Sequence, residues 1–329
     1  MIQISYLIVL LTSGLFTYLS AIIYQVIFNY NFKNKNISVP TGFGFTLPIL
    51  LIIFLIIFKF DSININFYKS ILIILIGGII YFIDDIKGLS PAIRLFISSV
   101  SGIILLNQNK IYNHDSFNIF LLCIFSVLIL CLLTNVFNFY DGADLNLTTT
   151  IFLFGSCLLK YNFLLFYGLV LIGYSIGFGL VNKKRNSIYL GDSGSYVFAS
   201  IVFLIFASSY FQSNFVPLTL IYPLILPTID VLFVLLIRIK KNHNLLSRNY
   251  LHIYQRININ YKSFLYLLPQ FVHLILALLI DFILNSLGIM NKFQITFSVL
   301  FIYSPLFYLL TRKFFLEKSY FFGDGSKDE

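Results

Sequence analysis

Two adjacent carboxylates, Asp84 and Asp85, end an apolar stretch of the sequence that begins at Ile71. A carboxylate at the centre of a bilayer costs roughly 2.5 to 3.5 kcal/mol, so the pair is expected where water or a cation can reach it. Lys87 and Arg94 follow closely, and the apolar pattern then resumes. The sequence therefore predicts two membrane spans joined by a short charged loop at a membrane surface, although a solvated helix end would carry the same charges.

A second polar group interrupts the apolar pattern between residues 135 and 144. Asn135, Asn138 and Asp141 follow one another at steps of three, which places their side chains on one face of a helix. Gly142 is typical of a helix end, and Asp144 lies just beyond it. Three polar side chains on one stripe of an otherwise apolar helix favour a binding role over simple solvation.

A loop of small residues precedes a later apolar stretch. Residues 191–195 read Gly-Asp-Ser-Gly-Ser, and Asn182 with a basic triplet at 183–185 lies ahead of them. A loop of this kind can offer backbone N–H groups to a phosphate while its aspartate, Asp192, binds Mg²⁺. We therefore expect an anion and a divalent cation to meet at this loop.

Two further loops carry weaker signals. The loop from Arg238 to Lys262 is basic and rich in hydrogen-bonding side chains, which suits a phosphorylated or sugar-bearing ligand. A lone histidine in it, His252, is as consistent with an ordinary hydrogen bond as with catalysis. The first loop, Val39–Phe45, contains a proline and two glycines that permit a tight turn near a ligand, but by itself it predicts only a turn.

The whole chain has the composition of a helical membrane protein. Hydrophobic residues make up 59% of its 329 residues, charged residues 11%, and the mean hydropathy is +0.90. Only helices and closed barrels satisfy the backbone in lipid, so we predict an all-α membrane domain over residues 1–311 and a polar tail over 312–329. The transmembrane helices, about eleven in number, are expected near 6–28, 44–58, 70–83, 92–106, 117–134, 147–159, 163–181, 195–211, 215–237, 264–287 and 293–311.

The basic residues predict the orientation of the chain in the membrane. Most of the 22 Lys and Arg residues fall in alternate loops and in the tail, and such residues favour the cytoplasmic side. The N-terminus is thus expected outside and the C-terminus inside, with the acidic groups described above on the cytoplasmic face. Because the bases are scattered through short loops, nucleic-acid binding is not expected. Cys123, Cys131 and Cys157 lie in apolar stretches, which argues against disulfide bonds and thiolate metal sites.

Taken together and in order, these groups resemble a known family. The Asp84-Asp85 pair, the run from Asn135 to Asp144, Asn182 and the Gly191–Ser195 loop are similar to motifs of the polyprenyl-phosphate N-acetylhexosamine-1-phosphate transferases, over residues 38–257. The resemblance implies an integral membrane enzyme with its active site at the cytoplasmic face. It also implies the reaction, in which a sugar 1-phosphate moves from a UDP-sugar to undecaprenyl phosphate and UMP is released.

The resemblance further implies roles for individual residues. Mg²⁺, or Mn²⁺ in its place, is expected as the cofactor, with Asp192 and Asp85 as metal ligands. The expected catalytic residues are Asp84, Asp85, Asp141 and His252. The expected substrate-binding residues are Asn135, Asn138, Asp144, Asn182, Arg248, Tyr254, Gln255 and Arg256. The expected partners are undecaprenyl phosphate, a UDP-N-acetylhexosamine and the lipid bilayer, and a homodimer is left open.

Two departures from the family pattern bear on the identity of the sugar. Many members have His-x-His-His before an arginine, whereas residues 250–256 read Tyr-Leu-His-Ile-Tyr-Gln-Arg here, and Gly42 and Gly44 are separated where the family has adjacent glycines. The first departure resembles the branch that starts O-antigen or capsule units in the bacterial inner membrane. That branch uses 6-deoxy sugars, such as UDP-N-acetylfucosamine or UDP-N-acetylquinovosamine.

Three alternatives stay open at this point. The first is a member of the same family that is specific for UDP-N-acetylglucosamine. The second is an ion-coupled transporter, because intramembrane acids and glycine-interrupted helices also mark transport pathways, although here the acids gather at one face and no internal repeat is visible. The third is a non-catalytic scaffold for glycan assembly, which would tolerate the loss of Asp192.

Overall fold

The computed structural model describes residues 2–32, 39–58, 65–107, 116–184, 187–213, 218–242, 251–261, 264–288 and 291–316, and the ordered elements of this part of the chain are all helical. The chain divides into two compact units, Met1–Pro217 and Leu218–Glu329, called unit 1 and unit 2 below. The prediction of an all-α fold is confirmed for the described residues. The single domain expected over residues 1–311 stays a prediction.

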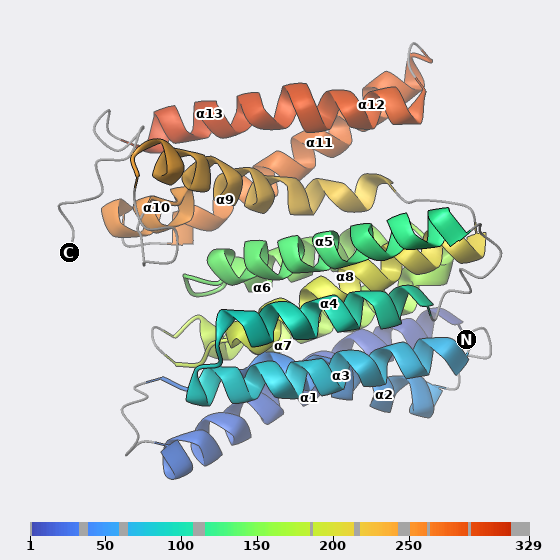
Figure 1. Ribbon diagram of the computed structural model, residues 1–329, viewed down its shortest axis with the longest axis vertical. Coiled ribbons are helices and arrows are strands. Elements are labelled where there is room, and N and C mark those ends of the chain that lie inside the picture. Colours follow the sequence, from blue (N-terminus) through green and yellow to red (C-terminus); the bar gives the residue numbers. More distant parts are fainter. Residues whose placement is uncertain are drawn as a thin grey trace. The chain divides into compact units, whose positions relative to one another are not determined.

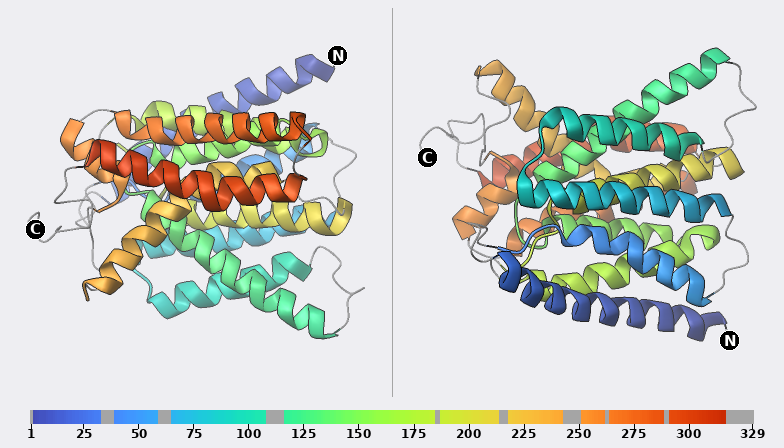
Figure 2. Two further views of the ribbon diagram at one scale, coloured as in Figure 1. Left: turned by 90° about the horizontal axis from the view of Figure 1, so that it is seen from above. Right: turned by 60° about the horizontal axis from the view of Figure 1, so that its bottom comes forward.

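Unit 1 is a bundle of helices that run roughly along one direction (Figures 1 and 2). Its helix α8 is largely buried, because α3, α4 and α5 all pack against it. A second set of contacts joins α1 and α6 to α7. The helices are α1 (Ile2–Phe32), α2 (Thr46–Phe58), α3 (Ile65–Lys87), α4 (Pro91–Asn107), α5 (Ser116–Tyr140), α6 (Asn146–Leu158), α7 (Leu165–Asn182) and α8 (Gly191–Ser213).

Small residues let these helices approach one another closely. A Cβ atom at Gly77 of α3 would lie 2.1 Å from the hydroxyl oxygen of Tyr196 of α8. That hydroxyl donates to Ser101 Oγ of α4 at 2.6 Å, so one tyrosine ties α8 to both neighbours. At the other side of the bundle, a Cβ at Gly173 of α7 would lie 1.9 Å from Ser13 Oγ of α1. Such close approaches are typical of helix packing in membranes, where van der Waals contact and interhelical hydrogen bonds hold helices together.

Unit 2 contains α9 (Tyr222–Lys240), α10 (Ile253–Tyr261), α11 (Leu268–Ser286), α12 (Lys292–Ser298) and α13 (Ser304–Phe315), with a π-helical turn, Val299–Tyr303, between the last two. The helix α10 lies within the loop expected between two membrane spans. The helix α13 runs past the expected start of the polar tail, and Arg312 is fully buried in unit 2. The remainder of the expected tail, from residue 317, lies outside the described residues.

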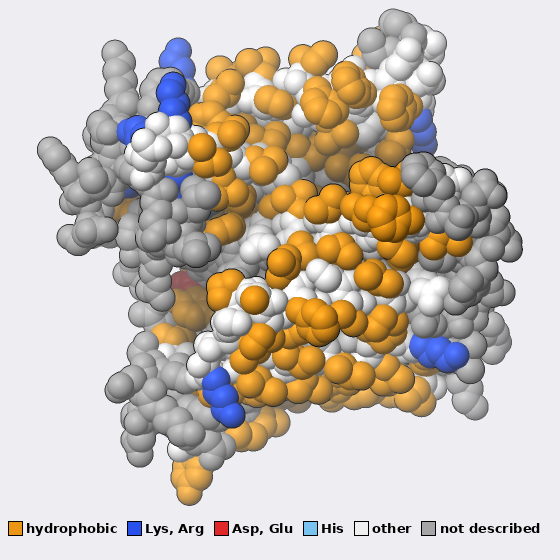
Figure 3. Space-filling model, viewed as in Figure 1, with side chains coloured by type: hydrophobic (Ala, Val, Ile, Leu, Met, Phe, Trp, Pro, Cys, Tyr) orange, Lys and Arg blue, Asp and Glu red, His pale blue; other side chains and the backbone are white. Residues whose placement is uncertain are grey.

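Eight helices of the described residues are long and apolar enough to cross a membrane, which indicates a membrane protein. Three shorter apolar helices, Phe43–Phe58, Pro91–Asn107 and Asn146–Leu158, correspond to three of the other expected spans. The exact number of about eleven crossings stays a prediction. Hydrophobic side chains cover the middle of the helices, and the visible Lys and Arg side chains lie towards their ends (Figure 3).

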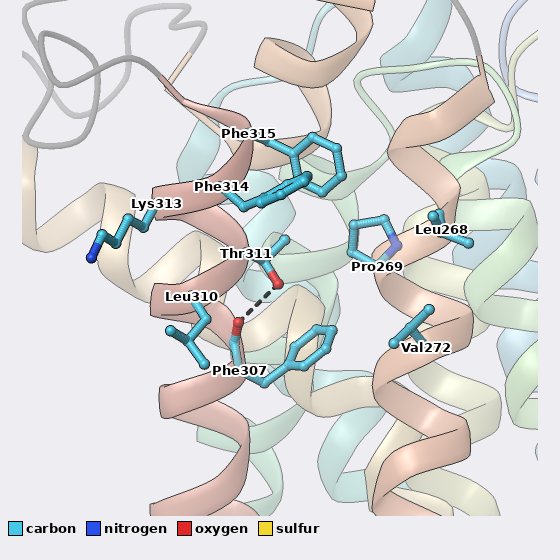
Figure 4. Close-up of a pocket in the computed structure, with 9 residues that line it drawn as sticks. All are labelled: Leu268, Pro269, Val272, Phe307, Leu310, Thr311, Lys313, Phe314 and Phe315. Carbon is cyan, nitrogen blue, oxygen red and sulfur yellow. Dashed lines mark hydrogen bonds between the residues drawn. The ribbon is translucent and has the colours of Figure 1, made fainter.

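Unit 2 also has an apolar groove of about 690 Å³ between α11 and α13 (Figure 4). Leu268, Pro269 and Val272 of α11 line one side, and Phe307 and Phe314 of α13 contribute to the other. The hydroxyl of Thr311 in the groove donates to the carbonyl oxygen of Phe307 at 2.8 Å, within its own helix. None of the groove-lining residues is among the site residues expected from the sequence.

Candidate functional site

Five helix ends of unit 1 meet at one end of the bundle, and the acidic residues of unit 1 that the structure describes gather there. The C-terminal ends of α3, α5 and α7 bring Asp84, Asp85 and the residues around Asp141 to this end. The N-terminal ends of α4 and α8 bring Arg94 and Asp192. Hydrogen bonds and ion pairs join these elements directly, so motifs separated by more than a hundred residues form one cluster.

Asp85 caps the N-terminus of α8. Its Oδ1 accepts a hydrogen bond from the backbone N–H of Asp192 at 2.9 Å, and its Oδ2 accepts one from the N–H of Ser193 at 3.1 Å. The Thr41 hydroxyl also donates to Oδ1, at 3.3 Å. Because the first N–H groups of a helix have no partner within the helix and carry positive partial charge, a carboxylate stabilises them well. Asp85 thus holds α8 in place and so positions the side chain of Asp192.

The N–H groups of this loop have acceptors within the chain itself, and their expected contact with a phosphate stays a prediction. Besides the two that Asp85 accepts, the N–H of Gly191 donates to Asp141 Oδ2 at 3.2 Å. The N–H of Gly194 donates to the carbonyl oxygen of Leu190 at 3.2 Å. Sequence reasoning identified a helix N-terminus with the right small residues, but the occupant is this chain's own pair of carboxylates.

The separated glycines of the first loop have a packing role. Gly42 has a φ of +89°, and Gly191 opposite has a φ of +74°, both in the left-handed region that suits glycine. A Cβ at Gly44 would lie 2.0 Å from the Cα of Gly194, so two backbones touch there. The N–H of Gly44 also donates to the carbonyl oxygen of Leu190 at 3.1 Å. The loop therefore supports the start of α8 through direct backbone contact.

Arg94 bridges two carboxylates of the cluster. Its Nε lies 3.2 Å from Asp84 Oδ2, and its Nη1 lies 3.1 Å from Asp192 Oδ2. The Asp84 side chain is only 3% exposed, whereas Asp192 and Arg94 are 25% and 36% exposed, so the open side of the cluster is formed by the last two. Asp84 also accepts a hydrogen bond from the N–H of Leu89. The guanidinium group shows that this position between the carboxylates accommodates a cation.

Arg94 was not among the residues expected to form the site, although its position in the sequence indicates that an anion lies nearby. It lies in the first turn of α4, where a positive charge opposes the helix dipole. A base at such a position is favourable only with a nearby anion. The acidic pair nine and ten positions earlier supplies one candidate, and the structure adds Asp192 from a distant part of the chain.

The turn after α5 adds further carboxylates to the cluster. Asn138 in the last turn of α5 lies beside the Asp192 carboxylate. Burial raises the pKa of the Asp141 carboxyl well above its usual range, and the nearby Asp85, Asp192 and Asp144 raise that pKa further, while the bond from the Gly191 N–H lowers it. Because neighbouring carboxylates add to the effect of burial on this pKa, a cation bound among them would lower it.

Two of the expected substrate-binding asparagines have backbone partners. The side chain of Asn135 is exposed and donates to the carbonyl oxygen of Cys131 at 2.8 Å. The buried Asn182 accepts from the N–H of Leu145 at 2.6 Å and donates to the carbonyl oxygen of Ile188 at 2.6 Å. Leu145 has a φ of +62°, which a leucine rarely adopts. Asn182 therefore positions both the turn after α5 and the segment that leads into α8.

The remaining expected residues belong to unit 2. Nδ1 of His252 lies 3.0 Å from Asp230 Oδ2, and the His252 ring stacks on Tyr254 with centroids 5.6 Å apart. Tyr254 and Arg256 are buried, and Gln255 is partly buried. All four lie at the start of α10 or directly before it. Arg248 lies outside the described residues.

The open side of the acidic cluster suits a divalent metal ion that keeps part of its coordination shell as water or substrate oxygen. Among the described residues, no group of three or more His, Cys, Asp or Glu side chains is arranged as a preformed metal cage. Mg²⁺ seldom needs one, because one or two carboxylates, water and substrate phosphates usually complete its coordination. The partly exposed Asp192, the neighbouring Asp84 and a bridging guanidinium between them fit such an ion.

Part of the chain matches a known protein family. Residues 66–210 match the model of Glycosyl transferase family 4. The matched segment runs from α3 into α8 and includes every acidic residue of the cluster, as well as Arg94, Asn138 and Asn182. The match supports this family for that part of the chain and a sugar-phosphate transferase activity in general. No curated protein matches the chain.

Proposed function

We propose that this chain transfers an N-acetylhexosamine 1-phosphate from a UDP-sugar to undecaprenyl phosphate and releases UMP. The observation that supports the proposal most is the cluster of Asp84, Asp192 and Arg94 at one end of a membrane-helix bundle, within the segment that matches the transferase family. A charged cluster at a helix end suits a reaction between a water-soluble nucleotide and a lipid phosphate. The expected site of action is the cytoplasmic face of the bacterial inner membrane.

The proposed reaction needs no proton transfer. An oxygen of the lipid phosphate attacks the β-phosphorus of the UDP-sugar and forms a new P–O bond. The bond between that phosphorus and the bridging oxygen breaks, and its electron pair leaves with UMP. Phosphate monoesters have a second pKa of about 6, so the lipid phosphate is already mostly dianionic at neutral pH. Positioning and charge balance should therefore dominate catalysis, as in other phosphoryl transfers.

The residues of unit 1 have distinct parts in this proposal. Mg²⁺, or Mn²⁺ in its place, would be held by Asp192 with Asp84 nearby and would neutralise charge on the pyrophosphate. The second ligand proposed here is Asp84 and not the Asp85 expected from the sequence, because both oxygens of Asp85 accept from N–H groups of α8. Arg94 is the cationic side chain nearest to those carboxylates among the described residues, and it would bind a phosphate oxygen. Asp85 and Asp141 hold the start of α8 by their bonds to its N–H groups. Asn138, beside Asp192, would orient that carboxylate.

The identity of the sugar is proposed from the loop before and within α10. We propose that sugar choice depends on the segment from Arg248 to Arg256, which includes His252, Tyr254 and Gln255, and that the preferred donor is a 6-deoxy N-acetylhexosamine. A site without partners for a 6-hydroxyl would leave that group unpaired, whereas an apolar surround accepts a 6-methyl group. The product would then begin an O-antigen or capsule unit. A strong preference for UDP-N-acetylglucosamine would instead indicate a member of the same family that is specific for that donor.

The test is a reaction of the purified protein with undecaprenyl phosphate, Mg²⁺ and a panel of UDP-sugars, with UMP as the readout. We expect UMP only when the lipid phosphate is present, and the highest kcat/KM with a 6-deoxy donor. Equal kcat/KM values for 6-deoxy and glucosamine donors would contradict the sugar assignment. Absence of UMP with every donor, together with ion-dependent solute uptake into proteoliposomes, would favour a transporter.

A further inference from the structure

We propose that Asp230 is a positioning residue that fixes His252 and the start of α10, and that the last helix, α13, completes this arrangement. The inference rests on the proposed function, because it assigns His252 a part in the transferase reaction. Asp230 lies in α9 and is 2% exposed. It lies outside the segment that matches the transferase family.

Three donors from two separate segments converge on the Asp230 carboxylate. Oδ1 accepts from the N–H of Ile253 at 3.2 Å and from the hydroxyl of Tyr308 at 3.0 Å. Oδ2 lies 3.0 Å from Nδ1 of His252. Because Ile253 is the first residue of α10, the carboxylate also caps that helix at its positive end. One side chain therefore sets the direction of α10 and the position of the imidazole ring.

The helix α13 holds the same segment from another side. Nη1 of Arg312 donates to the carbonyl oxygen of Leu251 at 3.0 Å and to the Tyr308 hydroxyl at 3.1 Å. Its guanidinium carbon lies 5.0 Å from the centroid of the Phe233 ring in α9, a cation–π distance. Arg312 is fully buried. Residues far from any recognised motif thus fix the backbone directly before His252.

A purely structural anchor would not need these residue types. Buried charges carry a large desolvation cost, and packed hydrophobic residues often replace them without loss of stability. A carboxylate adds what a hydrophobic side chain cannot, because it accepts from Nδ1 and so determines which ring nitrogen carries the proton. The stacking of the Tyr254 ring on the imidazole restricts it further. Asp230 and Tyr254 therefore fix both the tautomer and the orientation of the His252 ring, which a purely structural contact would not require.

A double-mutant cycle separates a positioning role from a structural one. Asp230→Asn is made in the wild-type chain and in the His252→Gln chain, and both turnover and UDP-sugar binding are measured in all four proteins. Asparagine has one acceptor oxygen for three donors, so the ring and α10 are no longer held together. If Asp230 acts through His252, we expect Asp230→Asn to reduce kcat/KM at least about tenfold in wild type but less than about twofold in His252→Gln.

The same factor of loss in both backgrounds, or a large loss from Asp230→Asn with none from His252→Gln, would overturn the inference. If Asp230→Asn does not fold, Tyr308→Phe takes its place in the cycle, since it removes one donor and keeps the carboxylate. Tyr303→Phe is the matched control, because the Tyr303 hydroxyl donates to the carbonyl oxygen of His273 instead, and it should leave kcat/KM unchanged. A wild-type chain without UMP release would defeat the proposed function itself, which is a different outcome from an additive cycle.

Discussion

Asp84 and Asp85 are neighbours in the sequence but hold different parts of the site. Asp84 pairs with Arg94, and Asp85 caps α8. The sequence predicts that both carboxylates lie at a membrane surface near a cation. It cannot assign one of them to a helix terminus more than a hundred positions away, because that pairing exists only after α3 and α8 pack together.

The capping role predicts a loss of stability from Asp85→Ala. Removal of a capping side chain costs about 0.5 to 2 kcal/mol in typical helices, so we expect a lower melting temperature for unit 1. Asp192→Ala is the control, since it removes a carboxylate of the same cluster that accepts no backbone N–H in the contacts described above. Unfolding can be followed by the reaction of the buried Cys157 thiol with a dye after Cys123 and Cys131 are replaced by alanine. Equal melting temperatures for the two variants would contradict the capping role.

The bridging position of Arg94 predicts a change in the response to metal ions. In Arg94→Gln the carboxylates of Asp84 and Asp192 lose their shared counter-ion, so we expect a lower melting temperature without divalent ions. Mg²⁺ should then raise the melting temperature more than it does in wild type, because it no longer competes with an arginine. Lys87→Gln, at an exposed base of the same loop, should respond as wild type does. An unchanged Mg²⁺ effect in Arg94→Gln would contradict competition for this position.

At the scale of elements, the start of α8 shows how far sequence reasoning reaches. The sequence of 191–195 predicts N–H groups that face a phosphate, whereas in the structure the backbone of this loop lies against Gly44 and its N–H groups donate to Asp85 and Asp141. The nature of the partner could not be predicted, since Asp85, Asp141 and Gly44 reach the loop only through the packing of α3, the turn after α5 and the first loop. Asn182 is similar. The sequence predicts that Asn182 lies near the site, but it does not predict the two hydrogen bonds from its side chain to the backbone.

The contact between the first loop and α8 predicts a severe effect of Gly44→Ala. The added Cβ would lie 2.0 Å from the backbone of Gly194, so the loop or the start of α8 must shift. We expect a loss of transferase turnover and a destabilisation of more than about 1 kcal/mol.

Gly179→Ala is the matched control for this substitution. Its Cβ would meet its nearest neighbour at an ordinary 3.4 Å, and Gly179 lies inside α7, where alanine is the better helix former. That variant should keep wild-type turnover and stability. Similar losses in both variants would show that the backbone contact at Gly44 has no special part.

At the scale of the whole molecule, hydropathy predicted most helices correctly. Each of the expected apolar segments overlaps a described helix, because the bilayer imposes both the composition and the helical backbone. The helical segments that hydropathy did not predict contain polar residues. The helix α10 has a low apolar content and lies in an expected loop, and α13 includes Arg312, which reads as a tail residue until Tyr308 and the Leu251 carbonyl are placed beside it.

The expected orientation in the membrane is tested at the two ends of α7. Lys160 precedes this helix and Lys184 follows it, and both side chains are exposed. In a chain without other cysteines, we expect Lys184→Cys to react with a membrane-impermeant thiol reagent only after the inner membrane is opened. Lys160→Cys should react without that treatment. The reverse pattern would place the acidic cluster on the outer face and exclude a cytoplasmic UDP-sugar as its substrate.

The central claim is that the acidic cluster of unit 1 transfers a sugar phosphate with the help of a divalent ion at Asp192. Its most direct test is UMP release that depends on added undecaprenyl phosphate, measured for wild type and Asp192→Asn with and without EDTA. The loss of a metal ligand removes several kcal/mol of transition-state stabilisation, and each factor of ten in rate corresponds to about 1.4 kcal/mol. We therefore expect at least about a hundredfold loss of rate in a folded Asp192→Asn protein. EDTA should abolish the wild-type rate. Near-normal UMP release by Asp192→Asn, or a wild-type rate that EDTA leaves unchanged, would contradict the claim.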